Sequence, residues 1–237
     1  MLDLTEQRLN RTIITLAWPA ILESLLQLTV YLTDSIMIGP LGSEAFAAVG
    51  QGSMLVHYIT FPLWGIGTAA GAIVSRNIGR QDTAAAQDGA GQGLLLAIFS
   101  GMIFTVVGFL YGRDILVLLG TPDEVLEPCT NYLVTVLAFN TFYSVRMVGS
   151  SILRAVGDTK TPMIATGVMN VFNIGANYVL IYGVGPFPRL ETTGVALASG
   201  LSFVISATIV SWKLFRNPKG FRLLTGHLLA FRRAEFR

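Results

Sequence analysis

Long apolar runs recur along this chain, and they restrict its fold more than any other feature of the sequence. A run of about 18 or more residues with few charges is long enough to cross the hydrocarbon core of a membrane as a helix. Of the 237 residues, 52% are hydrophobic and only 13% are charged, against roughly 25% charged in an ordinary soluble domain. The mean hydropathy is +0.62. We therefore predict an all-α polytopic membrane protein embedded in a lipid bilayer.

Six membrane-spanning helices are expected, because polar and turn-forming segments divide the apolar sequence into six runs. The runs lie at residues 13–38, 45–75, 90–111, 130–152, 162–182 and 193–214. They are too long for strands and lack a two-residue alternation. We divide the chain into a six-helix unit at residues 1–216 and a basic, amphipathic cytoplasmic linker at residues 217–237, whose composition suits a membrane surface.

The basic residues are distributed unevenly between the two sides of the membrane. If both chain ends are cytoplasmic, 13 of the 16 lysines and arginines lie inside, Arg113 and Arg189 lie outside, and Arg146 falls within the fourth span. Positive charge accumulates in cytoplasmic loops. The start of the chain carries Asp3 and Glu6 and no small-residue cleavage site, so the first span is expected to remain as an anchor. We predict a multi-pass protein of the inner (plasma) membrane with both termini in the cytoplasm.

Several functional classes are not expected from this sequence. A net charge of +2 is too small to favour nucleic acid as a partner. Gly65, Gly67 and Gly71 lack the spacing and the preceding strand of a nucleotide-binding loop, so close helix packing explains them better. No nucleophile–base pair or His/Cys cluster occurs at suitable spacing, so we expect neither enzymatic activity nor a bound cofactor.

Polar side chains line one face of the first and of the fifth expected span. The stripe of the first span lies within about 40° of arc on a helix of 3.6 residues per turn and consists of Glu23, Gln27 and Asp34. The stripe of the fifth span consists of three asparagines at helical spacing, Asn170, Asn173 and Asn177. Both stripes must face the interior of the bundle, because an acid that faces lipid costs several kcal/mol.

The polar residues of three spans are expected at one depth in the membrane. Counted from the ends of their helices, Asp34, Asn177 and Ser199 all lie in the outer half. A carboxylate among neutral oxygens can hold a proton or a hard cation such as Na⁺. Burial favours the neutral form of such an acid, so its charge becomes switchable. We expect Na⁺ or H⁺ to bind at Asp34 and no other metal site.

Each of these residues also has a structural interpretation. Intramembrane Asn and Ser side chains often only hold helices together. Glu23 lies nearer the cytoplasm and can extend its charged end to the interface. Arg146 is interpreted as a snorkelling or ion-pairing group rather than as a ligand. The side chains expected to line the cavity beside the ion site are Glu23, Gln27, Tyr31 and Asn170.

Four segments of the chain resemble one transporter family. They read "WPAILESLLQLTVYLTDSIMIGPLG", "GTAAGAIVSRNIGRQD", "ILRAVGDTKTPM" and "NIGANYVLIYG". They are similar to the first five helices of the multidrug and toxic compound extrusion (MATE) family, and the likeness covers residues 10–216. It implies an antiporter, driven by Na⁺ or H⁺, that exports bulky and often cationic organic compounds by alternating access.

The resemblance also implies roles for particular residues. In the family's prokaryotic members an acid in the first helix and polar residues in the fifth and sixth form a cation site. The positions that match here are Asp34, Asn173, Asn177 and Ser199. Pro19, in "WPAIL", matches a proline associated with bending of the first helix, and a proline does remove a helical hydrogen bond.

The likeness stops at half of the family's architecture. Such transporters have twelve helices in two pseudo-symmetric lobes, whereas this chain is expected to have six. Its partner would be a missing C-terminal lobe or a second copy of the chain. Two other functions stay open: a flippase of lipid-linked precursors from the same superfamily, and a membrane scaffold that transports nothing.

Overall fold

Every regular element in residues 6–216 and 221–223, the part of the chain that the computed structural model describes, is a helix. The helices are α1 (Glu6–Ile38), the short 3₁₀ helix η1 (Gly39–Leu41), α2 (Ser43–Gly79), α3 (Thr83–Leu118), α4 (Asp123–Ala138), α5 (Asn140–Ala155), α6 (Lys160–Tyr182) and α7 (Glu191–Arg216). The all-α prediction is confirmed. Five of these helices, α1, α2, α3, α6 and α7, are long and apolar enough to cross a membrane.

The fourth expected span, residues 130–152, is wrong as a single helix. The structure has two helices of 16 residues, α4 and α5, which meet at Phe139. The amide of Phe139 donates to the carbonyl of Val136, three residues back instead of the usual four. No proline or glycine lies at the break. Phe139 instead packs against Gly200 of α7, where a larger residue would collide with its ring.

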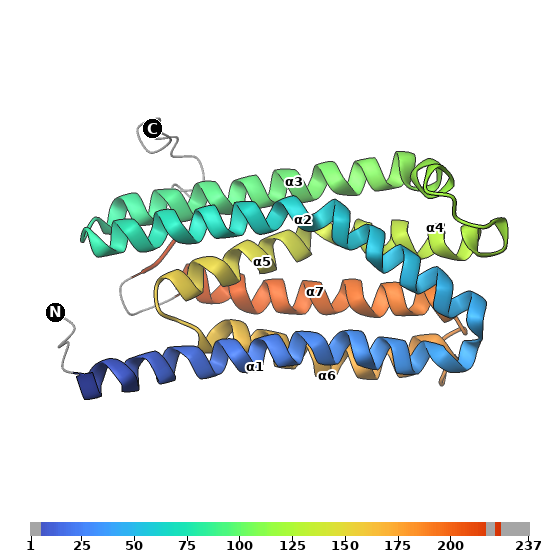
Figure 1. The fold of residues 1–237 in the computed structure, drawn as a ribbon, viewed down its shortest axis with the longest axis horizontal. Coiled ribbons are helices and arrows are strands. Elements are labelled where there is room, and N and C mark those ends of the chain that lie inside the picture. The colour runs from blue at the N-terminus through green and yellow to red at the C-terminus, as the bar shows by residue number, and fades with distance from the viewer. Residues whose placement is uncertain (1–5, 217–220, 224–237) are drawn as a thin grey trace.

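The helices form a bundle with their axes roughly along its long direction (Figure 1). α1 lies beside α6, α6 beside α7, and α2 pairs with α3 in a long hairpin. The α2–α3 turn, the α5–α6 turn and the C-terminal end of α7 lie at the same end of the bundle as the start of α1. We call this the basic end, because it carries Arg76, Arg80, Arg154, Lys160, Lys213, Arg216 and Arg222.

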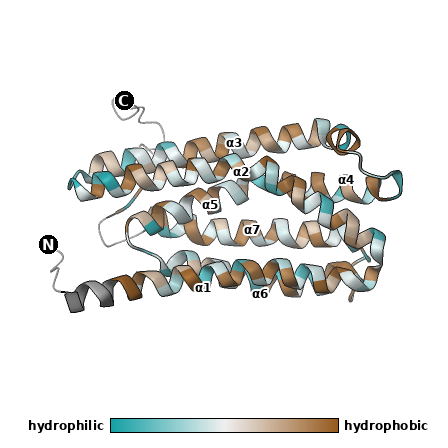
Figure 2. Cartoon of the chain, viewed as in Figure 1, coloured by the Kyte–Doolittle hydropathy of each residue, from teal (hydrophilic) through white to brown (hydrophobic). Residues whose placement is uncertain are grey.

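Hydrophobic residues extend along the outside of the bundle as well as into it. Figure 2 shows hydrophobic residues over most of the length of α1 and α3. In the most apolar stretch of α1 only 11% of the residues are buried, against 56% for α7. Leucines and isoleucines such as Ile21, Leu25 and Ile36 are exposed. Exposed apolar side chains along whole helices fit a multi-pass membrane protein, because lipid covers them.

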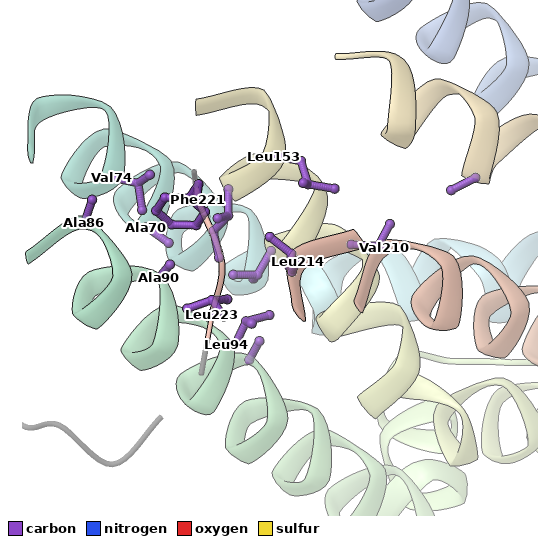
Figure 3. Close-up of a cluster of buried hydrophobic side chains, with 14 residues drawn as sticks. Ala70, Val74, Ala86, Ala90, Leu94, Leu153, Val210, Leu214, Phe221 and Leu223 are labelled. Atoms are coloured by element: carbon purple, nitrogen blue, oxygen red, sulfur yellow. The ribbon is translucent and has the colours of Figure 1, made fainter. Parts of the chain in front are cut away.

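A hydrophobic cluster closes the basic end. It joins α2, α3, α5 and α7 with Phe221 and Leu223, which are both buried (Figure 3). The amide of Leu223 donates to the carbonyl of Leu214 at 3.0 Å, so the chain folds back onto the end of α7. The rest of the predicted linker, residues 217–220 and 224–237, lies outside the described residues.

Small residues allow α2 and α3 to approach closely. A side chain at Gly93 of α3 would come within 2.6 Å of Ala70 of α2, which is too close for two carbon atoms. The glycines predicted to serve close packing differ: a side chain at Gly71 would come within 2.8 Å of Ser151 of α5, whereas one at Gly65 would meet no atom within 4 Å. α2 also contains Pro62, and Figure 1 shows the helix bent between its two ends. A proline removes one backbone hydrogen bond and permits such a bend.

Candidate functional site

A chain of hydrogen bonds runs from α1 through α6 to α7. The amide nitrogen of Asn177 donates to Oδ1 of Asp34 at 2.5 Å and to Oδ1 of Asn173 at 3.1 Å. The amide nitrogen of Asn173 in turn lies 3.4 Å from the hydroxyl of Ser199. Asn177, Asn173 and Ser199 are buried, and Asp34 is half-buried. The structure thus brings together the four residues for which the sequence suggests an ion site.

Two further contacts hold α1 against α6 on either side of Asp34. Asn170 donates to the backbone carbonyl of Leu26 at 2.6 Å, and the hydroxyl of Tyr182 donates to the carbonyl of Met37 at 2.8 Å. Asn170, Asn173 and Asn177 follow one another at helical spacing, so one face of α6 reaches α1 at successive turns. The position of Asp34 relative to the amides is therefore fixed by contacts above and below it.

The environment of Asp34 is rich in neutral oxygen atoms. The buried Oδ1 atom of Asn177 has no hydrogen-bond partner among the described residues, and neither does that of Asn170. A buried acceptor without a donor is costly, so such atoms are commonly explained by an ion or a water molecule. Carboxylate and amide oxygens are ligands for hard cations. The arrangement suits a proton on Asp34 or a small cation shared between Asp34 and Asn177.

Glu23, the other acid on this face of α1, has a different partner. One guanidinium nitrogen of Arg154, at the end of α5, donates to both carboxylate oxygens of Glu23 at 3.1 and 3.0 Å. Glu23 is 4% exposed. The amide of Gln27 lies 3.5 Å from the same carboxylate. The charge of Glu23 is therefore paired with a permanent cation, and its side chain is buried.

Two adjoining cavities lie inside the bundle, the second between α1, α2 and α5 and the first bounded also by α4, α6 and α7. The first has a volume of about 180 Å³ and reaches from Asp34 to Arg146. Its wall includes six aromatic side chains, Tyr31, Phe46, Trp64, Tyr132, Tyr143 and Phe203. The second has a volume of about 210 Å³, lies nearer the basic end and includes Glu23, Arg146 and Arg154 in its wall.

The four residues predicted from the sequence to line a cavity occupy different positions. Gln27 lines both cavities, Tyr31 lines the first, and Glu23 lines the second. Asn170 lines neither, because its side chain is buried against the backbone of α1. Pro19 is buried inside α1, below Glu23 toward the basic end.

Three contributors to these cavities cannot be read from the sequence. Tyr132 belongs to the half of the fourth span that comes before the break, Arg154 is predicted only as a cytoplasmic residue, and Arg146 is predicted only as a snorkelling or ion-pairing group. One signal points to the arginines. The residues Asn140, Ser144, Arg146 and Ser150 give α5 a buried polar face, and Arg154 lies exposed near the end of the same helix.

Comparison with known proteins agrees with this geometry. The MatE family model matches residues 19–179. A probable multidrug resistance protein NorM from Thermotoga maritima is 30% identical over 92% of this chain and 47% of its own length. A protein named as an FAD transporter from Shewanella oneidensis is 26% identical over 95% of this chain and 48% of its own. The chain thus spans about half the length of the curated relatives it matches.

A solved structure has the same arrangement of helices. It is described as an outward-facing conformation of a multidrug resistance MATE family transporter of the MOP superfamily. It superposes with a TM-score of 0.85 at 26% identity, over 94% of this chain and 49% of that chain. The family model covers the polar stripes of both α1 and α6, and the bundle matches one lobe of a solved transporter. This chain therefore belongs to the MatE family of membrane transporters.

Proposed function

We propose that this chain forms one lobe of an antiporter that uses a gradient of Na⁺ or H⁺ to export bulky, often cationic organic compounds. The single observation that carries the proposal is the hydrogen-bond chain from Asp34 to Ser199. Asp34 is an ionisable residue at membrane depth whose observed partner is a neutral amide. Such residues mark ion and proton pathways in membrane proteins.

The neutrality of Asn177 supports a carboxylate whose charge changes. A permanent cation beside Asp34 would hold it ionised and would compete with Na⁺ or H⁺ for it. An amide instead stabilises the carboxylate by one hydrogen bond and adds no charge. The oxygen of the same amide, buried without a partner among the described residues, gives Na⁺ a second neutral ligand.

The mechanism proposed for coupling involves α1. Ion binding at Asp34 removes its net charge, which changes how strongly α1 is held against α6. Pro19 leaves one carbonyl of α1 without its helical hydrogen bond, so bending there costs less than elsewhere. A change in the bend of α1 alters the first cavity, since Gln27, Tyr31 and Asp34 are in its wall. A compound held there would then be released to the outside.

The cavity itself supports an organic substrate. Aromatic rings offer a large apolar surface to flat molecules. The faces of the rings also attract cations. Alternating access also needs a second lobe, which we propose comes from the remainder of a longer protein or from a second copy of the chain. We place the lobe in the inner membrane with the basic end in the cytoplasm, because positive charge concentrates on that side.

The test is drug efflux by the complete transporter after Asp34→Asn. This change keeps the shape of the side chain and removes its ability to ionise. We expect Na⁺- or H⁺-coupled efflux from proteoliposomes to fall about a hundredfold, the scale seen when a positioned proton-transfer group is lost. Imposing each gradient alone then identifies the coupling ion.

Asp114→Asn is the matched control, because Asp114 is an exposed acid on α3 and lines neither cavity. Its efflux should equal that of the unaltered protein. Undiminished coupled export by Asp34→Asn would refute the proposed role of Asp34. A scaffold that transports nothing would show no efflux in any variant.

A further inference from the structure

A buried arginine stands at the junction of the two cavities. Arg146 is 7% exposed, and it lines both cavities together with Gln27, Trp64 and Tyr143. Its guanidinium carbon lies 5.4 Å from the centre of the Tyr143 ring. It forms none of the ion pairs found in the described part of the chain.

The surroundings of Arg146 leave its positive charge without a carboxylate. The acid in the wall of the second cavity, Glu23, is bound to Arg154 through both of its oxygens. The acid of the first cavity, Asp34, is hydrogen-bonded to Asn177. Of the four charged side chains in the two walls, two are arginines beside one paired glutamate, so the cavity nearer the basic end has an excess of positive charge.

The hydrogen-bonding capacity of Arg146 is also unused. Its Nε atom is buried and has no acceptor among the described residues. An arginine in a membrane span without a partner is costly, so such residues normally face a cavity and bind a ligand. The contact with Tyr143 is made to the face of its ring and supplies no oxygen acceptor, so the planar fork of N–H donors can still bind an anion.

We propose that Arg146 is a binding residue for an anionic group, a carboxylate or a phosphate, on an exported compound whose aromatic body occupies the first cavity. The inference deepens the proposed export function and rests on it. It assigns the two ends of the binding region opposite charges, Asp34 at one end and Arg146 at the other. The preferred substrates would then be zwitterionic aromatic molecules, which carry an anionic group as well as a cationic one, rather than simple organic cations.

The test uses two dyes that differ only in one anionic group. Rhodamine B has a free carboxylate and a cationic ring system, and its ethyl ester has the same ring system without the carboxylate. Binding of each to the complete purified protein is measured by fluorescence polarisation without an ion gradient. We expect the free acid to bind roughly tenfold more tightly than the ester, as for a hydrogen-bonded charge pair.

Three variants test whether the preference for rhodamine B over its ester depends on Arg146. Arg146→Gln should remove it by weakening only the binding of rhodamine B, whereas Arg146→Lys should retain part of it because the charge remains. Arg76→Gln is the control, since Arg76 is exposed at the end of α2 and lines neither cavity. Displacement of rhodamine B by phosphatidylglycerol would assign the anion site to a lipid headgroup, and no displacement would assign it to the exported compound.

The proposal is overturned if the unaltered protein binds the ester as tightly as the acid or does not measurably bind the acid. Both results are read without any variant, so misfolding of Arg146→Gln does not affect them. A preference that persists in a folded Arg146→Gln protein also overturns it. Because no gradient is present, the outcome is separate from that of Asp34→Asn efflux.

Discussion

Two acids on the same face of α1, 11 residues apart, are held in different ways. Glu23 lies against a guanidinium that contacts both of its oxygens, whereas Asp34 lies against an amide. A permanent cation fixes the charge of its partner, and a neutral donor does not. The difference supports the proposals that Glu23 attaches α1 to α5 and that Asp34 exchanges a cation. Changes at the two acids should therefore affect different properties.

The largest effect is expected on protein stability when Arg154, the partner of Glu23, is replaced. Arg154→Gln strands a carboxylate whose side chain is 5% exposed and should lower the free energy of unfolding by about 3 kcal/mol. Glu23→Gln should lower it by only about 1 kcal/mol, because the Arg154 side chain is 37% exposed and its charge can reach a polar environment. Equilibrium unfolding in mixed micelles measures both.

The double variant Glu23→Gln/Arg154→Gln is the control for this asymmetry. It leaves no uncompensated charge, so it should be more stable than Arg154→Gln alone. If Glu23→Gln proves the more damaging of the two single changes, the pair does not act as an anchor for a buried acid.

An intermediate effect is expected when Asp34 loses its amide. Asn177→Leu keeps most of the side-chain volume and removes a hydrogen bond to a charged group, which is worth about 1.5–3 kcal/mol. Coupled efflux should fall roughly tenfold while the protein still folds. The measurement is efflux beside a size-exclusion profile of the same preparation. Efflux equal to that of the unaltered protein would show that Asn177 is not part of the ion site.

The smallest effect is expected at the far end of the hydrogen-bond chain. Ser199 lies 3.4 Å from Asn173 and contacts Asp34 only through the two asparagines. Ser199→Ala should change efflux only about twofold, because a neutral bond of this length contributes less than about 1 kcal/mol. A loss as large as that of Asn177→Leu would mean that the hydroxyl itself binds the ion.

Local sequence patterns were sufficient to predict most of the fold and the set of residues around Asp34. Apolar length identifies five of the helices, and helical spacing places Asn173 and Asn177 on one face. The break at Phe139 could not be predicted, because no local proline or glycine marks it and the residue that Phe139 packs against, Gly200, comes 61 residues later in the chain.

The pairing of the charged residues was equally out of reach. Charge counts place Arg154 on the cytoplasmic side, but its ion pair with Glu23 depends on where α5 ends relative to α1. From the sequence, Arg146 is interpreted as a snorkelling or ion-pairing residue. Only the two cavities that it lines show that its environment is different. The ion pair of Arg154 and the environment of Arg146 both depend on contacts between helices that are far apart in the sequence. Such contacts leave no local pattern in a single sequence.

The division of the fourth span also bears on how the protein enters the bilayer. A helix of 16 residues is about 24 Å long, which is shorter than the roughly 30 Å of the hydrocarbon core. α5 in addition carries Arg146, which is buried among the other helices, and Arg154, which is paired with Glu23 of α1. We therefore expect α4 and α5 to enter the membrane together as one segment, because neither helix is long enough to cross it alone.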